Sequence, residues 1–541
     1  MNIPSPANDS LAAGPGSLTR WFLGARARVR PAPRRLVMKI LRLLLLGLGL
    51  AAFARADVTL APLFTDHAVL QCDKPLPVWG RAEPGEHVTV EFKGQAVGAT
   101  TGSDGRWIVY LEPVPASAEP AELVVTGKNT LKFADLLVGE VWLVGGQSNM
   151  EWDVAHANNA AKEVAEANFP LLRHIKVEHA IADDGPHDTA KTSGWQAATP
   201  ATAGTFSAIG FFFGRDLVRK LSVPVGIVNC TWGGTPIEAW MSGAALQGTA
   251  AWATVKVRWQ KDLAESVERK ANWPREYEAW KQAEEHAKAT KTKNVIPYPR
   301  PNRGPGSPYA INVLFNGMMA PLQPYALRGF LWYQGESNWA QPGEYADLFP
   351  AMIRAWRAGF GLGDAPFYFV QLAAYSQGDD PTHRGWAYLR EAQTRALALP
   401  AVAMVTAIDI GDPKDIHPRN KQEVARRLAL IAKAQVYGIP GDYAGPAFES
   451  LAREGHALRV RFSHASAGLI SYDKPVQSLE LAGADRVFHP ATARIERGTL
   501  LVTSPAVKEP VAVRYAWSNA PVANLYNGAG LPALPFRSDA W

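Results

Sequence analysis

The sequence of 541 residues has only two cysteines, Cys72 and Cys230, which excludes the disulfide-dense class of small secreted scaffolds. It also lacks a His-Glu-x-x-His run, closely spaced cysteine pairs, a P-loop lysine and a dinucleotide fingerprint. We therefore expect neither a metal site nor a cofactor. The two cysteines can pair or stay free, although Cys230 ends an apolar run and is typical of a small buried hydrophobic residue.

The net positive charge is confined to the first 56 positions. Residues 1–56 hold eight arginines, one lysine and one aspartate, so the formal charge of +6 arises there and the remaining chain is slightly acidic. A basic surface that binds nucleic acid is thus not expected. Eighteen tryptophans exclude a disordered chain, and the length predicts roughly two to four domains.

The basic leader has the pattern of a secretory signal. From residue 38 it reads Met-Lys-Ile-Leu-Arg, followed by an apolar run over 43–53 and by Ala-Arg-Ala at 54–56. This run is too short for a lasting membrane span, and the small residues form a cleavage site. We predict a leader over 1–56 with the signal at 38–56, export to the periplasm or the outside of the cell, and no stable membrane anchor after cleavage. A buried N-terminal helix is the alternative.

The mature chain has three regions of different pattern. Residues 57–138 alternate short apolar strands with Gly and Pro turns, which predicts an N-terminal β-sandwich. Residues 441–541 repeat this pattern and predict a β-rich C-terminal domain. Residues 139–440 instead contain apolar runs typical of parallel strands buried on both faces, which predicts an α/β fold. These runs are 141–144, 225–228, 330–333, 367–370 and 401–408.

The α/β region is also expected to contain helices and one insertion. One helix is predicted over 209–221 and another over 421–437, where Asn420 can cap the N-terminus. Residues 249–308 are predicted to be a helical insertion. Its first part has the pattern of a charged helical hairpin, which breaks at Pro274 because proline cannot continue the hydrogen bonding of a helix.

Polar segments follow four of the apolar runs, and ligands of open α/β sheets bind beyond the carboxyl ends of the strands. The segments are 145–150 (Gly-Gly-Gln-Ser-Asn-Met), 229–235 (Asn-Cys-Thr-Trp-Gly-Gly-Thr), 334–338 (Gln-Gly-Glu-Ser-Asn) and 409–417, which ends in Asp-Ile-His. Each segment alone is equally typical of an ordinary turn. Together they supply a hydroxyl, a glycine pair, amides and an Asp/His loop, which are the components of a serine hydrolase.

The segments resemble the sialate O-acetylesterase family, which belongs to the SGNH (GDSL-like) hydrolases. The resemblance rests on 145–150, on 232–240 (Trp-Gly-Gly-Thr-Pro-Ile-Glu-Ala-Trp), on 332–338 (Trp-Tyr-Gln-Gly-Glu-Ser-Asn) and on 415–418 (Asp-Ile-His-Pro). It implies an SGNH-type parallel sheet flanked by helices, between an N-terminal β-sandwich and a C-terminal β-rich domain. It further implies a carbohydrate O-acetylesterase that removes acetyl groups from sialic acids or xylan-type polysaccharides through an acetyl-serine intermediate.

The resemblance implies roles for individual residues. Ser148 would be the nucleophile, and His417 would be the base that activates it. The oxyanion would be stabilised by the N–H groups of Ser148 and Gly234 and by the side-chain amide of Gln334. The remaining polar residues of the motifs would bind substrate or support the site; these are Gln147, Asn149, Gly233, Glu336 and Asn338.

The carboxylate that orients the histidine is left open by the sequence. Many SGNH enzymes place an aspartate three residues before the histidine, where this chain has Lys414. Asp415 is favoured over Asp412, because alternate side chains of an extended segment point the same way and Asp415 is two residues before His417. A backbone carbonyl that orients the ring is the third possibility.

Two other functions remain open at this point. Another serine esterase or a lipase could use the same scaffold, although long acyl chains would require an apolar channel. A non-catalytic carbohydrate-binding protein could bind through its β domains, but the presence of both Ser148 and His417 argues against it. The expected partner is an acetylated carbohydrate, and the sequence does not indicate an oligomeric state.

Overall fold

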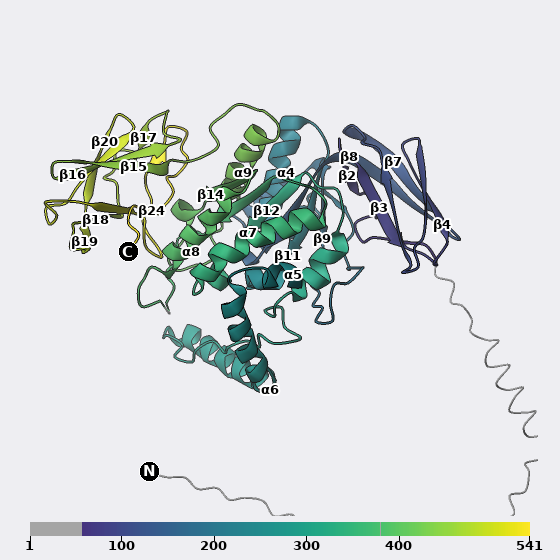
Figure 1. Cartoon of the computed structure of the whole chain (residues 1–541), viewed down its shortest axis with the longest axis horizontal. Coiled ribbons are helices and arrows are strands. Elements are labelled where there is room, and N and C mark those ends of the chain that lie inside the picture. The colour runs from purple at the N-terminus through teal and green to yellow at the C-terminus, as the bar shows by residue number, and fades with distance from the viewer. Residues whose placement is uncertain (1–56, 379) are drawn as a thin grey trace, which may run out of the picture. The chain divides into compact units, whose positions relative to one another are not determined.

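The computed structural model describes residues 57–378 and 380–541. The predicted leader, with its signal at 38–56, lies outside these residues. Helices and strands both contribute to the described chain, which is a mixed α/β protein (Figure 1). Over the same residues, no helix combines the length and the apolar character that a membrane span requires.

A parallel sheet forms the middle of the described chain (Figure 1). Its strands lie in the order β9–β11–β8–β12–β13–β14, all of them parallel, and β10 adds an antiparallel edge beside β9. All five predicted apolar runs overlap strands of this sheet, and every residue of β11, β12 and β13 is buried. The bounds are β8 (Thr130–Gly146), β9 (Phe169–Lys176), β10 (Gln196–Ala198), β11 (Val225–Thr231), β12 (Gly329–Tyr333), β13 (Phe367–Gln371) and β14 (Val402–Thr406).

Helices connect these strands. The α-helices are α2 (Ser148–Glu151), α3 (Ala160–Ala165), α4 (Ala208–Leu221), α5 (Gly243–Gln247), α6 (Trp252–Thr290), α7 (Pro342–Gly359), α8 (Gly385–Thr394) and α9 (Lys421–Gln435). Short helical turns include η1 (Val154–His156), η2 (Ala203–Thr205), η3 (Ile237–Trp240), η4 (Phe315–Met319), η5 (Ala320–Leu322), η6 (Glu336–Asn338), η7 (Arg395–Ala398) and η8 (Ile408–Ile410). The two predicted helices correspond to α4 and α9. The Asn420 side chain caps α9 by accepting a hydrogen bond of 3.2 Å from the Glu423 N–H, as the sequence predicted.

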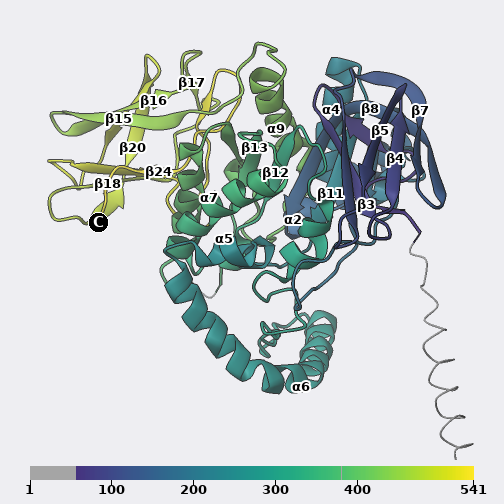
Figure 2. The same ribbon diagram turned by 45° about the vertical axis from the view of Figure 1, so that its right-hand side comes forward.

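The insertion differs from the prediction of a helical hairpin. Instead of breaking at Pro274, α6 is a single helix of 39 residues that contains this proline. Figure 2 shows α6 curving along its length. A proline inside a helix removes one N–H donor and bends the axis, and here the helix continues beyond the bend.

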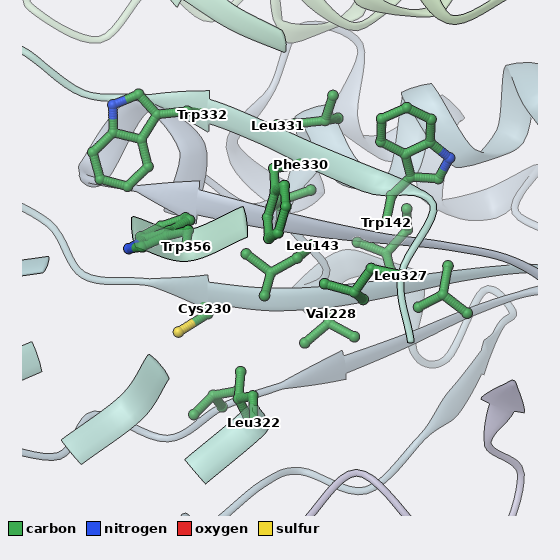
Figure 3. Close-up of a cluster of buried hydrophobic side chains, with 14 of the residues drawn as sticks. Trp142, Leu143, Val228, Cys230, Leu322, Leu327, Phe330, Leu331, Trp332 and Trp356 are labelled. Atoms are coloured by element: carbon green, nitrogen blue, oxygen red, sulfur yellow. The ribbon is translucent and has the colours of Figure 1, made fainter. Parts of the chain in front are cut away.

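Large apolar side chains fill the space between the parallel sheet and its helices (Figure 3). Trp332 of β12 and Trp356 of α7 are fully buried and meet edge to face, with ring centroids 5.3 Å apart. The indole nitrogen of Trp356 donates a hydrogen bond of 3.0 Å to the Trp240 carbonyl, so this polar atom is satisfied inside the core. Cys230 of β11 lies in the same cluster and is unpaired.

The N-terminal strands join the central sheet through β8. They are β1 (Thr59–Leu60), β2 (Val69–Gln71), β3 (Leu76–Arg81), β4 (His87–Phe92), β5 (Gln95–Thr100), β6 (Arg106–Leu111) and β7 (Ser117–Thr126). The first half of β8 pairs with β7 in antiparallel fashion, and its second half pairs with β11 and β12 in parallel. The boundary predicted between residues 138 and 139 therefore falls inside one continuous strand.

A buried ion pair lies in β8 where these two sheets meet. Glu140 is 5% exposed, and Arg328 donates to both of its carboxylate oxygens, at 2.5 and 2.8 Å. The Tyr437 hydroxyl, just beyond α9, and the Cys72 thiol, just beyond β2, donate to the same carboxylate at 3.1 and 3.2 Å. Because a buried charge is costly unless it is paired and hydrogen-bonded, this arrangement satisfies Glu140 completely. It also shows that Cys72 is a free thiol and forms no disulfide with Cys230.

The C-terminal region is rich in β-structure, as its sequence pattern predicted. Two four-stranded antiparallel sheets have the orders β15–β16–β21–β20 and β19–β18–β22–β24, and β17 pairs with β23. These sheets enclose a second apolar core. The bounds are β15 (Ala447–Glu454), β16 (Ala457–Ser463), β17 (Leu469–Ile470), β18 (Leu479–Ala482), β19 (Phe488–Pro490), β20 (Thr492–Glu496), β21 (Thr499–Thr503), β22 (Ala512–Tyr515), β23 (Tyr526–Asn527) and β24 (Phe536–Arg537).

The end of β8 requires a glycine, which leads to a stability prediction. Gly146 has a φ of 131°, and a Cβ at this position would lie 2.2 Å from the Tyr333 carbonyl oxygen. We expect Gly146→Ala to lower the free energy of unfolding by about 2–4 kcal/mol, measured by denaturant or thermal unfolding. Gly343→Ala is the matched control, because a Cβ at Gly343 meets no atom within 4 Å. Equal stability of the two variants would contradict the prediction.

Candidate active site

Ser148 lies in a sharp turn between β8 and α2. Gln147 precedes the helix in an extended conformation, and Ser148 is the first residue of α2. The Gln147 N–H donates a hydrogen bond of 3.0 Å to the Tyr333 carbonyl at the end of β12. The turn is thus fixed to the carboxyl edge of the parallel sheet, and the Ser148 side chain is only partly buried.

His417 meets Ser148 from the loop between η8 and α9. Its Nε2 lies 2.8 Å from the Ser148 Oγ, although the two residues are 269 positions apart in the sequence. The Trp152 indole stacks on the imidazole, with ring centroids 4.9 Å apart and an angle of 23° between the planes. The structure therefore brings together the predicted nucleophile and the predicted base at hydrogen-bond distance.

Asp415 lies near the other nitrogen of the His417 ring. Its Oδ1 is 3.8 Å from Nδ1, which is too long for a hydrogen bond, and the same oxygen accepts the backbone N–H of His417 at 2.9 Å. The Asp412 side chain is exposed and accepts the Lys414 N–H at 2.8 Å. Of the two carboxylates considered from the sequence, Asp415 therefore lies beside the ring, whereas Asp412 accepts a hydrogen bond within its own turn.

The glycine pair after β11 packs against the nucleophile. A Cβ added at Gly233 would lie 3.2 Å from the Ser148 Cβ, and Gly234 has a positive φ of 75°. The Gly233 N–H donates a hydrogen bond of 2.7 Å to Glu151. The N–H groups of Ser148 and Gly234 donate no hydrogen bond within residues 57–378 and 380–541. These two donors are therefore free to stabilise an oxyanion.

The prediction that Gln334 is a third oxyanion donor is wrong. Its side chain is fully buried, and its amide nitrogen donates to the Thr235 carbonyl at 3.1 Å and to Asn338 Oδ1 at 2.7 Å. Both hydrogens of the amide are thus already bound inside the protein. Gln334 instead connects the turn after β12 to the turn after β11.

The predicted supporting residues form a buried hydrogen-bonded layer around the site. Asn338 accepts the Ile237 N–H at 3.0 Å and donates to Glu238 at 2.8 Å. Gln147 accepts the N–H of Gly335 at 3.4 Å and that of Ser337 at 3.3 Å. These contacts connect the nucleophile turn with the two neighbouring turns.

The other two supporting residues bond to each other. The Asn149 amide donates a hydrogen bond of 2.5 Å to Glu336 Oε1. Glu336 Oε2 is buried and has no partner in the described chain. Burial raises the pKa of Glu336, while hydrogen bonds and the Lys421 charge act in the opposite direction.

Glu151 is a residue of the site that the sequence did not reveal. Besides the Gly233 N–H, its carboxylate binds Lys176 at 3.2 Å and His179 at 2.8 Å. Burial raises the pKa of Glu151, but its contacts with His179, Lys176 and the Gly233 N–H together outweigh burial and lower it. A negative carboxylate at this position holds the glycine turn beside Ser148. The only signal in the sequence was its position three residues after the serine, on the same helix.

Lys421 is the second such residue, and it changes the titration of the site. Burial lowers the pKa of Lys421 to about 7, against the opposing effect of Glu336 and Asp415. The pKa of His417 is also lowered, first by burial and second by the charge of Lys421, with Asp415 opposing. Lys421 stands four residues after His417, and nothing in the sequence marked it as part of the site.

Among the described residues, no group of three or more His, Cys, Asp or Glu side chains could hold a metal ion.

Comparison with known proteins identifies the family. The model of the family described as carbohydrate esterase, sialic acid-specific acetylesterase, matches residues 138–297 and 302–432, which is more than half of the chain. The chain belongs to this family. The match includes every residue of the Ser148–His417 site and the four segments that resembled the sialate O-acetylesterases in sequence.

Individual relatives extend the similarity beyond the acetylesterase family model. The sialate O-acetylesterase of Rattus norvegicus is 30% identical over 512 residues, which cover 85% of this chain and 90% of the relative. The sialate O-acetylesterase of Homo sapiens is 29% identical over 508 residues, which cover 85% of this chain and 88% of the relative. A solved structure of a carbohydrate acetylesterase from Xanthomonas citri is 39% identical, with a TM-score of 0.76, and covers 90% of this chain and 100% of that chain. The chain is therefore a carbohydrate acetylesterase.

The two aspartates of the histidine loop should differ in their effect on this esterase. We expect Asp415→Asn to lower kcat by about 100-fold, because the carboxylate beside Nδ1 stabilises the imidazolium that forms as His417 takes up a proton. Asp412→Asn should change kcat much less, because that side chain is exposed. The measurement is steady-state acetate release by both variants and by the double variant. A larger effect of Asp412→Asn would transfer the role to Asp412, and small effects of all three would indicate a Ser148–His417 pair oriented by backbone.

The lowered pKa of His417 predicts the acid limb of the pH profile. A neutral imidazole is needed to accept the serine proton, and a lowered pKa keeps the imidazole neutral to lower pH. We expect kcat/KM to fall on the acid side with a midpoint below about 6.5, the pKa of an ordinary histidine. A midpoint above that value, or a rate that is flat between about pH 5 and 8, would contradict a histidine base in this environment.

Proposed function

We propose that the protein hydrolyses acetyl esters on sugar hydroxyls through an acetyl-serine intermediate on Ser148. The observation that carries this proposal is the distance of 2.8 Å between the Ser148 Oγ and the His417 Nε2 at the carboxyl edge of the parallel sheet. The names of the relatives favour acetylated sialic acids as substrates, and acetylated xylan-type polysaccharides are the second candidate class.

In the first half of the reaction, His417 Nε2 takes the proton of Ser148 Oγ while the oxygen attacks the acetyl carbonyl carbon. The carbonyl oxygen becomes an oxyanion that the N–H groups of Ser148 and Gly234 stabilise. A donor of this kind lowers the barrier by about 3 kcal/mol. The intermediate then collapses, the ester bond to the sugar breaks, and His417 returns the proton to the departing sugar oxygen. The sugar leaves with a free hydroxyl, and Ser148 carries the acetyl group.

In the second half, water replaces the sugar. His417 takes a proton from water, the hydroxide oxygen attacks the acetyl carbon, and the same two N–H groups bind the second oxyanion. Collapse breaks the bond to Ser148 Oγ, which takes the proton back from His417, and acetic acid leaves and loses its proton to the solvent to give acetate. Each half uses the same base and the same donors.

The loop of Trp232 supports a carbohydrate substrate over a long acyl chain. Trp232 is partly exposed, directly precedes the glycine turn and stacks on His179, with ring centroids 4.1 Å apart and planes 6° from parallel. A fixed aromatic face beside the nucleophile offers a surface for a sugar ring. The proposal includes export of the enzyme, on the basis of the signal pattern at 38–56, to a compartment where acetylated polysaccharides or glycans are met.

The test uses Ser148→Ala and a panel of acetylated substrates. The wild type should release acetate from at least one of O-acetylated sialic acid, acetyl-xylan and acetyl-mannan, and Ser148→Ala should release none above background. Unfolding of Ser148→Ala should match the wild type, because a partly exposed side chain is shortened by one oxygen. Activity of Ser148→Ala at the wild-type level would remove this residue from the mechanism. Failure of the wild type on every acetylated sugar, with turnover of long-chain esters, would favour the lipase alternative.

A further inference from the structure

Lys421 is a buried cation that the reaction described above does not use. Its side chain is fully buried at the first position of α9, and its Nζ donates a hydrogen bond of 2.6 Å to Asn149 Oδ1. In the part of the chain that the structure describes, no carboxylate oxygen lies within 4.0 Å of this nitrogen. A buried ammonium group without an ion pair is unfavourable, so its position next to the catalytic residues needs a reason.

Asn149 connects Lys421 to both reacting residues. It directly follows Ser148, and its amide nitrogen donates to the Ile416 carbonyl, one residue before His417, at 3.1 Å. The second hydrogen of the same amide bonds to Glu336 Oε1 at 2.5 Å. Because Lys421 offers only donors, it can bond to the amide oxygen but not to the amide nitrogen. Lys421 thereby fixes the orientation in which Asn149 ties the serine segment to the histidine segment.

A second contact runs through Trp152. The Trp152 indole stacks on His417, and Lys421 Nζ lies 5.6 Å from the centre of this indole. The same nitrogen lies 5.8 Å from the centre of the Tyr333 ring. An ammonium group at this distance is attracted by the ring face, more strongly where water is excluded. Lys421 therefore contacts both groups that keep the imidazole in place, the Asn149 amide and the Trp152 ring.

We propose that Lys421 is a positioning residue, which holds His417 against Ser148 through Asn149 and Trp152. The inference rests on the proposed function of Ser148 and His417. It explains how the imidazole is held although Asp415 makes no hydrogen bond to the ring, at 3.8 Å. A shift of the base by about 1 Å can cost 100-fold in rate, so an indirect contact of this kind has a measurable effect on turnover.

The charge of Lys421 gives this role a signature in the pH profile. The charged or titratable groups that face Lys421 are Glu336 of η6, Tyr333 of β12, and Asp415 and His417 of the preceding loop. Its contacts on the side of α2 are the neutral Asn149 and Trp152, which directly follows the helix. Glu336 and Asp415 raise its pKa, and burial lowers it. In the acid limb, below about pH 6.5, Lys421 is protonated and opposes protonation of His417. Removal of the charge should therefore raise the pKa of His417.

The experiment compares Lys421→Met with Lys433→Met, assayed with the full chain and 4-nitrophenyl acetate. Both lysines lie on α9, but Lys433 pairs with Asp216 at 2.7 Å and has no contact with the site. For Lys421→Met we expect kcat to fall by about tenfold or more, with KM changed by less than about threefold. The acid midpoint of kcat/KM should move to higher pH. Lys433→Met should leave all three quantities at their wild-type values.

Lys421→Met leaves the buried Glu336 without its compensating charge, so this variant can fail to fold. A second variant covers that outcome. The double variant Lys421→Met/Glu336→Gln removes both charges and keeps an acceptor for Asn149, and it should show the same loss of kcat and the same shift. A folded double variant with the wild-type kcat and the wild-type acid midpoint would overturn the inference.

Failure of this inference is distinguishable from failure of the proposed function. If Ser148→Ala is inactive but Lys421→Met keeps the wild-type kcat, Lys421 has no positioning role and the function stands. A fall in kcat without a shift of the acid limb would reduce Lys421 to a structural residue and also overturn the inference. Absence of acetate release by the wild type would instead overturn the proposed function.

Discussion

The carboxylate of Glu140 is the contact on which the arrangement of the described chain depends. It lies in β8 at the point where the antiparallel pairing of the N-terminal strands changes to the parallel pairing of the central sheet. Arg328 reaches it from the segment before β12, Tyr437 from beyond α9, and Cys72 from beyond β2. Since an unpaired buried carboxylate is strongly unfavourable, these distant segments can pack only in the register that brings their donors together.

The same strand, β8, also leads directly to the active site. Its antiparallel pairing with β7 ends at Val138, its pairing with β11 begins at Glu140, and its pairing with β12 begins at Trp142. The strand ends at Gly146 against the backbone of Tyr333. The nucleophile, the glycine turn and the buried Glu336 turn are therefore anchored to three adjacent strand ends. Only His417 arrives on a loop, and it is held by stacking and by a hydrogen bond to the residue before it. A rigid edge thus presents the serine, and a supported loop supplies the base.

Much of this could be predicted from the sequence, because it depends on local patterns. The apolar runs give the strands of the parallel sheet, and Asn420 caps the helix that it was expected to cap. What failed depends on contacts between distant segments. A glutamine at a strand end looks the same whether its amide faces a substrate or, as in Gln334, is bonded to Thr235. Pro274 was expected to end a helix, but the hydrogen bonds on either side continue it. No pattern in the sequence marks Lys421 as part of the site, because its partners come from other elements.

The free thiols have a consequence for handling the protein. Cys72 and Cys230 are both buried, and burial raises the pKa of both thiols, so neither forms the reactive thiolate in the folded state. The described fold therefore does not depend on an oxidising compartment, and production in a reducing cytoplasm should give the same structure. Alkylating reagents can reach these sulfur atoms only when the surrounding strands open. The two cysteines thus serve as natural reporters of unfolding, one beside the Glu140 carboxylate and one in the core behind the active site.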